Sequence, residues 1–176
     1  MIETISIFLV ILQESDAIVL FKQMISLQMM SMIAYSDLMI GRIPRHFFIF
    51  SGIIGLFLDI VQIQPGFYLC GGIFSFSIMS FMYVLGKKYY QRRTEISDAF
   101  SGFGFGDVFA SGALGFLFGF SKAMVAVIMA LIFAVAVTLY RYIKQKEWSF
   151  FKGRIRLGPY FLVSTSIIVF VELLSF

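Results

Sequence analysis

The 176-residue chain has little of what soluble enzymes commonly use to build a site. It contains one cysteine, one histidine and three prolines, and only 14% of its residues are charged. The single cysteine, Cys70, excludes an internal disulfide and a cysteine-built zinc site. The single histidine, His46, has no second histidine or cysteine cluster to join it, so we predict no metal site there.

The chain is instead rich in apolar residues. Hydrophobic residues make up 60% of the chain, and the mean hydropathy is +0.92. A soluble protein cannot hide that much apolar surface, so the composition predicts an all-α fold, a polytopic membrane helical bundle with the lipid bilayer as its partner. Cys70 lies in an apolar run and is expected to face lipid or the bundle.

Six apolar segments predict about six transmembrane helices in one membrane-embedded domain covering residues 1–176. The turn QIQPG at residues 62–66 separates two of them. Residues 1–12 are too short to cross alone, so 1–16 form an N-terminal extension, either of the first helix or along the surface. The predicted spans are 17–36, 47–63, 67–86, 107–120, 123–140 and 157–176.

The positive charges predict the orientation of these spans. Twelve of the fourteen Lys and Arg residues fall in three loops, 38–46, 87–106 and 141–156, which alternation of the spans puts on one face. The positive-inside rule makes that face cytoplasmic. The net charge of +4 is therefore read as membrane orientation, not as nucleic-acid binding. The basic run 87–93 is expected to contact anionic lipid, His46 to lie at the interface, and Lys22 to snorkel or pair with another helix.

Two acids stand out against this background. Asp37 closes the first span and Asp107 opens the fourth, so the topology places both at the cytoplasmic face although seventy residues separate them. Acids at membrane depth are costly and usually functional. Two adjacent carboxyl groups can share one proton, and then one activates a water while the other donates a hydrogen bond to a substrate carbonyl. This is the chemistry of aspartic proteolysis.

Other interpretations of these residues stay open on the sequence alone. Asp107 suits a helix N-cap, and Asp37 suits a snorkelling acid beside Arg42. Asp98 is a weaker catalytic alternative. The glycines before Asp107 allow either a sharp turn that lets a peptide approach the carboxylate or a flexible loop. The small residues recurring every fourth position after it predict close helix packing; they are Ser111, Gly115 and Gly119.

A different class of function would use Asp37 and Asp107 as a proton or cation site in a small transporter or channel. Such a path should place carboxylates through the depth of the membrane. The apolar cores of the predicted spans are nearly free of acids, which disfavours this alternative.

Three segments carry a resemblance to a known family. GFGFGD at 102–107 contains the Gly-x-Gly-Asp pattern of intramembrane aspartyl proteases, in the residues Gly104, Gly106 and Asp107. SDLMIGRIPRHF resembles the Asp-x6-Pro segment of type IV prepilin peptidases, with Asp37 and Pro44 at its fixed positions.

The third segment, RIRLGPYFLVS at 154–164, resembles the family's Pro-Phe-Gly-Pro-Phe sequence in Gly158 and Pro159. The order of the segments and the six spans agree with the family over roughly residues 17–176. Arg45 stands where the family often has Asn, and Leu157 where it often has Phe. The Ile-Pro segment and the short chain favour this family over presenilin-like or signal-peptide-clearing enzymes.

The resemblance implies a short, peptidase-only enzyme of the bacterial or archaeal cytoplasmic membrane, without a methyltransferase segment. It would cut the basic leader from type IV prepilin or pseudopilin precursors at the cytoplasmic boundary, using no cofactor and no metal. Asp37 and Asp107 would be catalytic, and the supporting residues would be Gly104, Gly106, Pro44, Gly158 and Pro159.

Overall fold

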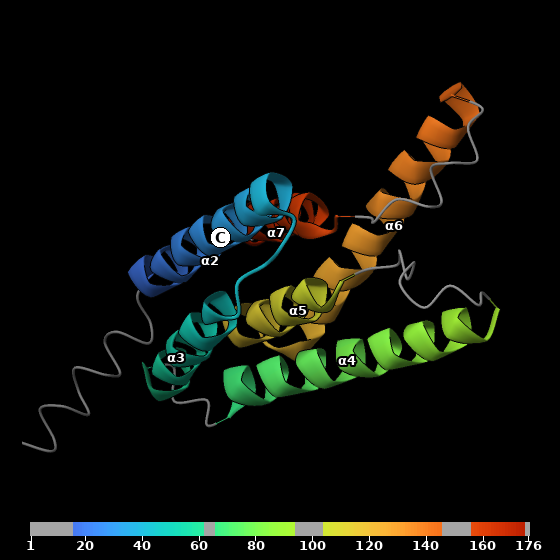
Figure 1. Cartoon of the computed structure of the whole chain (residues 1–176). Helices are drawn as coiled ribbons and strands as arrows, with labels where there is room; N and C mark the ends of the chain where they lie inside the picture. Colours follow the sequence, from blue (N-terminus) through green and yellow to red (C-terminus); the bar gives the residue numbers. More distant parts are fainter. Residues whose placement is uncertain (1–15, 62–65, 94–103, 146–155, 175–176) are drawn as a thin grey trace, which may run out of the picture.

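The computed structural model describes residues 16–61, 66–93, 104–145 and 156–174, and it contains six helices in these ranges (Figure 1). They are α2 (Asp16–Ile40), α3 (His46–Val61), α4 (Phe67–Arg93), α5 (Phe105–Phe118), α6 (Phe120–Gln145) and α7 (Gly158–Leu174). Each helix coincides with one predicted span to within a few residues at most ends. The all-α fold with six helices is therefore confirmed, while residues 1–15 lie outside the described part.

The apolar character of the helices is that of a membrane bundle. The stretches Phe67–Lys88 of α4 and Phe120–Tyr140 of α6 are long and apolar enough to cross a bilayer, and α3, α5 and α7 are shorter apolar helices. Large apolar side chains point outward from the bundle, as on α3, where Ile49, Phe50 and Ile53 are each about 60% exposed. Cys70 is likewise exposed. Such a surface is stable against lipid and unfavourable against water.

Helix α5 occupies the centre of the bundle. It contacts α3, α4 and α6 along much of its length and touches α2 and α7 (Figure 1). Every residue from Ala110 to Phe118 is buried. A helix that is apolar on all sides has no solvent face to orient it, so its neighbours determine where its ends point.

Small residues allow α4 to approach α5 closely. Ser111 donates to the carbonyl oxygen of Ser75 at 3.5 Å, and a Cβ built on Gly71 would meet the carbonyl oxygen of Gly115 at 2.8 Å. A Cβ on Gly119 would overlap the ring of Phe67. The predicted packing role of the small-residue stripe is confirmed, and its partner is α4, which runs antiparallel with a matching four-residue spacing.

Glycines also end two of the helices. Gly41 follows α2 with a φ of +68°, and Gly119 separates α5 from α6 with a φ of +74°. Both values lie in the left-handed region that glycine adopts without strain. The turn after Gly41 reverses the chain so that Ile43 is buried beside α5, which brings the end of α2 to the start of α5.

Substitution Gly115→Ala tests the contact between α4 and α5. The added methyl group would meet the backbone of Gly71, which cannot move without separating the helices. We expect a loss of about 1–3 kcal/mol of stability, measured as a lower midpoint of unfolding in detergent. Gly52→Ala is the matched control, because its Cβ would lie an ordinary 3.6 Å from the ring of Phe116. Equal midpoints for the two variants would contradict the close approach.

Candidate active site

Asp37 lies in the last turn of α2 and is buried, with 6% of its surface exposed. Its Oδ2 accepts a hydrogen bond of 2.9 Å from the backbone N–H of Gly158, the first residue of α7. The N-terminus of a helix carries free N–H groups and a partial positive charge that stabilise an anion. The interpretation of Asp37 as a snorkelling acid is therefore wrong, because its carboxylate points inward to the start of another helix.

Asp107 lies in the first turn of α5 and is also buried. Its Oδ2 accepts a hydrogen bond of 2.6 Å from the backbone N–H of Gly104. Gly104 is the N-cap of the helix, and Asp107 is the third residue after it. Asp107 is therefore not the N-cap residue, as one interpretation had it. Its carboxylate still contributes to the cap, because it accepts from the N–H of the N-cap residue. This contact fixes its direction.

The two carboxylates, seventy residues apart in the sequence, line one cavity of about 280 Å³. A water molecule needs roughly 15 Å³ of such space, so the cavity has room for a water and a peptide group. The Arg42 side chain is exposed at this site. The lining residues are Asp37, Gly41, Arg42, Ile43, Phe105, Gly106, Asp107 and Phe109.

Two of the predicted glycines lie in crowded places, Gly158 more tightly than Gly106. A Cβ on Gly106 would lie 3.1 Å from the Cβ of Ile43, and a Cβ on Gly158 would lie 2.7 Å from the Cβ of Asp37. Gly106 lines the cavity, whereas Gly104 and Gly158 act through their N–H groups. Of the predicted glycines, Gly104 is the extended N-cap of α5 and Gly106 lies in its first turn, and the earlier glycine lies outside the described residues.

The two predicted prolines are not among the residues that line the cavity. The carbonyl oxygen of Pro44 accepts from the N–H of Phe47 at 3.2 Å, in the turn that starts α3. Pro159 is the second residue of α7, where a helix needs no N–H donor. Both residues shape the chain around the site. Asp98, the weaker catalytic candidate, lies outside the described residues.

The sequence analysis did not single out one further side chain, Arg156. Its guanidinium donates to the carbonyl oxygen of Leu38, which is one of the last carbonyls of α2 and has no partner within the helix. This contact joins the segment before α7 to the end of α2, next to Asp37. From the sequence, Arg156 is one of several basic residues in a loop. The positive-inside rule accounts for such residues without requiring them to contact another helix.

A comparison with protein families matches residues 24–139 to the model described as the type IV leader peptidase family. The match includes both carboxylates, the Asp-x6-Pro segment and the Gly-x-Gly-Asp segment. The chain belongs to the type IV leader peptidase family. The resemblance to prepilin peptidases is thereby confirmed, and with it an aspartic endopeptidase activity in a membrane protein. No curated protein and no solved structure matches the chain.

Within this leader peptidase, Gly158→Ala tests whether the α7 N-terminus orients Asp37. The new methyl group would lie 2.9 Å from Oδ2 of Asp37, so the carboxylate must move away from its N–H donor. We expect peptidase activity to fall by about a hundredfold, as small misplacements of reacting groups can cause. Activity is compared at equal amounts of folded protein, with Gly52→Ala as the control. Full activity of Gly158→Ala would contradict the assignment.

Proposed function

We propose that this leader peptidase removes the leader from type IV prepilin or pseudopilin precursors at the cytoplasmic boundary of the membrane, with Asp37 and Asp107 as its catalytic pair. The observation that carries the proposal is the shared cavity, which both carboxylates line. The family supports the class of substrate. The geometry supports the choice of these two acids.

The proposed reaction needs one proton on the carboxyl pair. The ionised carboxylate removes a proton from a water molecule, whose oxygen attacks the carbonyl carbon of the scissile peptide. The protonated carboxyl donates a hydrogen bond to the carbonyl oxygen, which stabilises the developing negative charge. When the tetrahedral intermediate collapses, the C–N bond breaks and the leaving amine takes up a proton from the pair.

The fixed donors give each carboxylate a defined direction before substrate arrives. Gly158 N–H holds one oxygen of Asp37 and Gly104 N–H holds one oxygen of Asp107. Two groups held in place by backbone atoms need little rearrangement to act together, which lowers the entropic part of the barrier. The side chains that line the rest of the cavity include Phe105 and Phe109, which offer apolar contact to the substrate.

The position of the pair along the helices suits a substrate that crosses the membrane. Asp37 is near the end of α2 and Asp107 near the start of α5, on the side where the described residues of the Lys- and Arg-rich loops lie. With those loops cytoplasmic, the cavity opens where a cytoplasmic leader would meet a membrane helix.

The alternative of an ion or proton path receives no support from the acids in the described helices. Asp37 and Asp107 lie at one end of the bundle, and Asp59 and Glu172 lie in the terminal turns at the other. Asp59 accepts hydrogen bonds from backbone N–H groups of α4. Among the described residues, the helix segments between the two ends carry no acid. A path of carboxylates that pass a proton or cation across the membrane would need one there.

Substitution of either aspartate tests the catalytic pair. Asp37→Asn or Asp107→Asn keeps the size of the side chain but removes the shared proton, so we expect cleavage of a prepilin to fall by roughly a thousandfold or more. Membrane insertion should persist. Asp59→Asn is the matched control, a buried acid at the other end, and should cleave normally, as should Asp98→Asn. Normal processing by either active-site variant would refute the proposal.

The orientation has its own test. In a Cys70→Ala background, a cysteine at Arg45 should be labelled in intact cells only by a membrane-permeant maleimide. A cysteine at Phe67, the exposed first residue of α4, should also react with an impermeant maleimide. Both expectations follow from the positive-inside rule. The reverse pattern would place the catalytic cavity on the outer face.

A further inference from the structure

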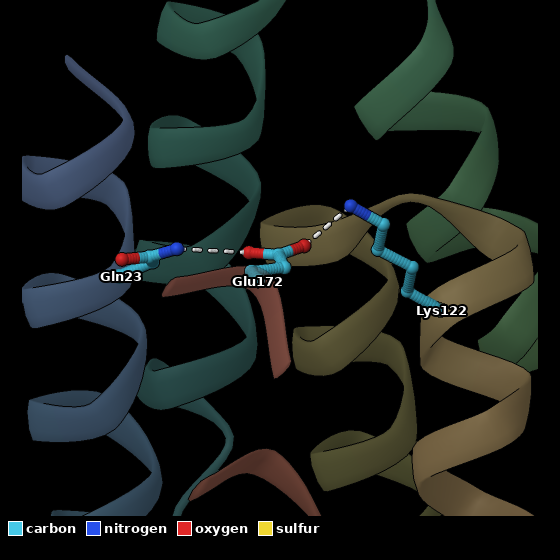
Figure 2. A network of polar contacts seen from close by, with 3 residues as sticks. All are labelled: Gln23, Lys122 and Glu172. Carbon is cyan, nitrogen blue, oxygen red and sulfur yellow. Dashed lines mark hydrogen bonds and ion pairs between the residues drawn. The ribbon is translucent and has the colours of Figure 1, made fainter. Parts of the chain in front are cut away.

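A group of polar side chains lies at the end of the bundle opposite the proposed catalytic pair. Glu172 of α7 accepts a hydrogen bond of 3.1 Å from the side-chain amide of Gln23 on α2 and forms an ion pair with Lys122 of α6 (Figure 2). Figure 2 shows the Glu172 carboxylate between its two partners, one oxygen turned to each. We call these three residues the far-end cluster.

Within this cluster, the buried hydrogen bond between Gln23 of α2 and Glu172 of α7 costs more free energy to break than the partly exposed ion pair. Gln23 is 2% exposed, and its Oε1 has no partner among the described residues. Lys122 is about half exposed, so solvent weakens its ion pair with Glu172. A buried amide that loses its acceptor keeps the full cost of desolvation. The Gln23–Glu172 hydrogen bond therefore favours one longitudinal position of α7 against α2.

The far-end cluster and the Asp37 contact are in register with each other. Asp37 follows Gln23 by fourteen residues on α2, and Gly158 precedes Glu172 by fourteen residues on α7. Fourteen residues are nearly four helical turns, or about 21 Å, so both contacts lie on nearly the same face of each helix. The two helices lie side by side and antiparallel (Figure 1). Because the spacing is equal on α2 and α7, the Gln23–Glu172 and Asp37–Gly158 hydrogen bonds can form at the same time without strain.

We infer that Gln23 and Glu172 are positioning residues for the peptidase reaction: they hold α7 in the register that presents Gly158 N–H to Asp37. The inference rests on the proposed function of Asp37. A hydrogen bond has a narrow range of lengths and angles, so the Gln23–Glu172 contact opposes a slide of α7 along α2. A slide of one ångström at the far end moves the N-terminus of α7 by the same distance, because a helix is a stiff rod.

The experiment compares Gln23→Leu and Glu172→Gln with the wild type, using a purified prepilin as substrate. Gln23→Leu keeps the volume and removes the donor; Glu172→Gln keeps an acceptor and removes the charge. We expect kcat to fall about tenfold or more for Gln23→Leu, with KM within about twofold, because Asp37 is misdirected while the substrate surface is intact. Glu172→Gln should fall less, since its amide oxygen can still accept from Gln23.

A second measurement reports the register itself. The Arg156 side chain reaches the backbone carbonyl of Leu38, so the substitutions Leu38→Cys and Arg156→Cys place two thiols near each other at the end of α2 and just before α7. In a Cys70→Ala background a short bismaleimide joins them. The yield of cross-linked protein should fall when Gln23→Leu is added. An unchanged yield together with an unchanged kcat would overturn the inference, and so would a double variant Gln23→Leu/Glu172→Gln whose losses simply multiply as those of independent sites.

Two controls separate the possible failures. Asp59→Asn replaces one of the two carboxylate oxygens that accept from the Tyr68 and Leu69 N–H groups at the same end of the bundle, and these hydrogen bonds join α3 to α4. If it lowers kcat as much as Gln23→Leu does, general loosening explains the effect and the inference fails. Asp37→Asn tests the proposed function itself: an inactive Asp37→Asn beside a fully active Gln23→Leu refutes the inference alone.

Discussion

A carboxylate at the edge of a bilayer is stable only if the protein supplies hydrogen-bond donors to it. The described structure meets this need at Asp37 with one backbone N–H group, that of Gly158. This contact joins the first of the described helices to the last, 121 residues apart. It requires a glycine, because a side chain there would occupy the place of the carboxylate, and it requires α7 to begin at that point and not one turn later.

The second carboxylate is fixed by a different means that depends on the same kind of donor. Asp107 is held by the N-terminus of its own helix, so its position in space is the position of α5. That helix is buried among its neighbours, and glycines set how near α4 can come. The packing of the bundle centre therefore determines where Asp107 points, and the α2–α7 pair determines where Asp37 points. The cavity exists because these two arrangements meet at Ile43, which is buried beside Gly106.

The features that sequence analysis predicted well are those that a single segment encodes. Apolar runs gave the six helices, and the alternation of spans put both aspartates at one end, because each span reverses the direction of the chain. The features that it missed depend on pairs of distant residues. Nothing local to Gln23 indicates Glu172, and nothing local to Arg156 indicates the carbonyl of Leu38. The error at Asp37 has the same origin: Arg42 is near in sequence, but the donor that holds the carboxylate comes from another helix.

Glu172 at the far end and the two aspartates at the cavity accept hydrogen bonds from different kinds of donor. At the far end, side chains surround Glu172, and a flexible amide and ammonium can follow its movements. At the cavity, Asp37 and Asp107 accept from backbone N–H groups at helix starts, which cannot follow a side chain; Asp59 at the far end is held in the same way. Gly158 and Gly104, which supply the donors at the cavity, are not among the residues that line it. For the proposed reaction, donors of this kind hold each carboxylate without placing a further side chain in the space that a water molecule and a substrate would occupy.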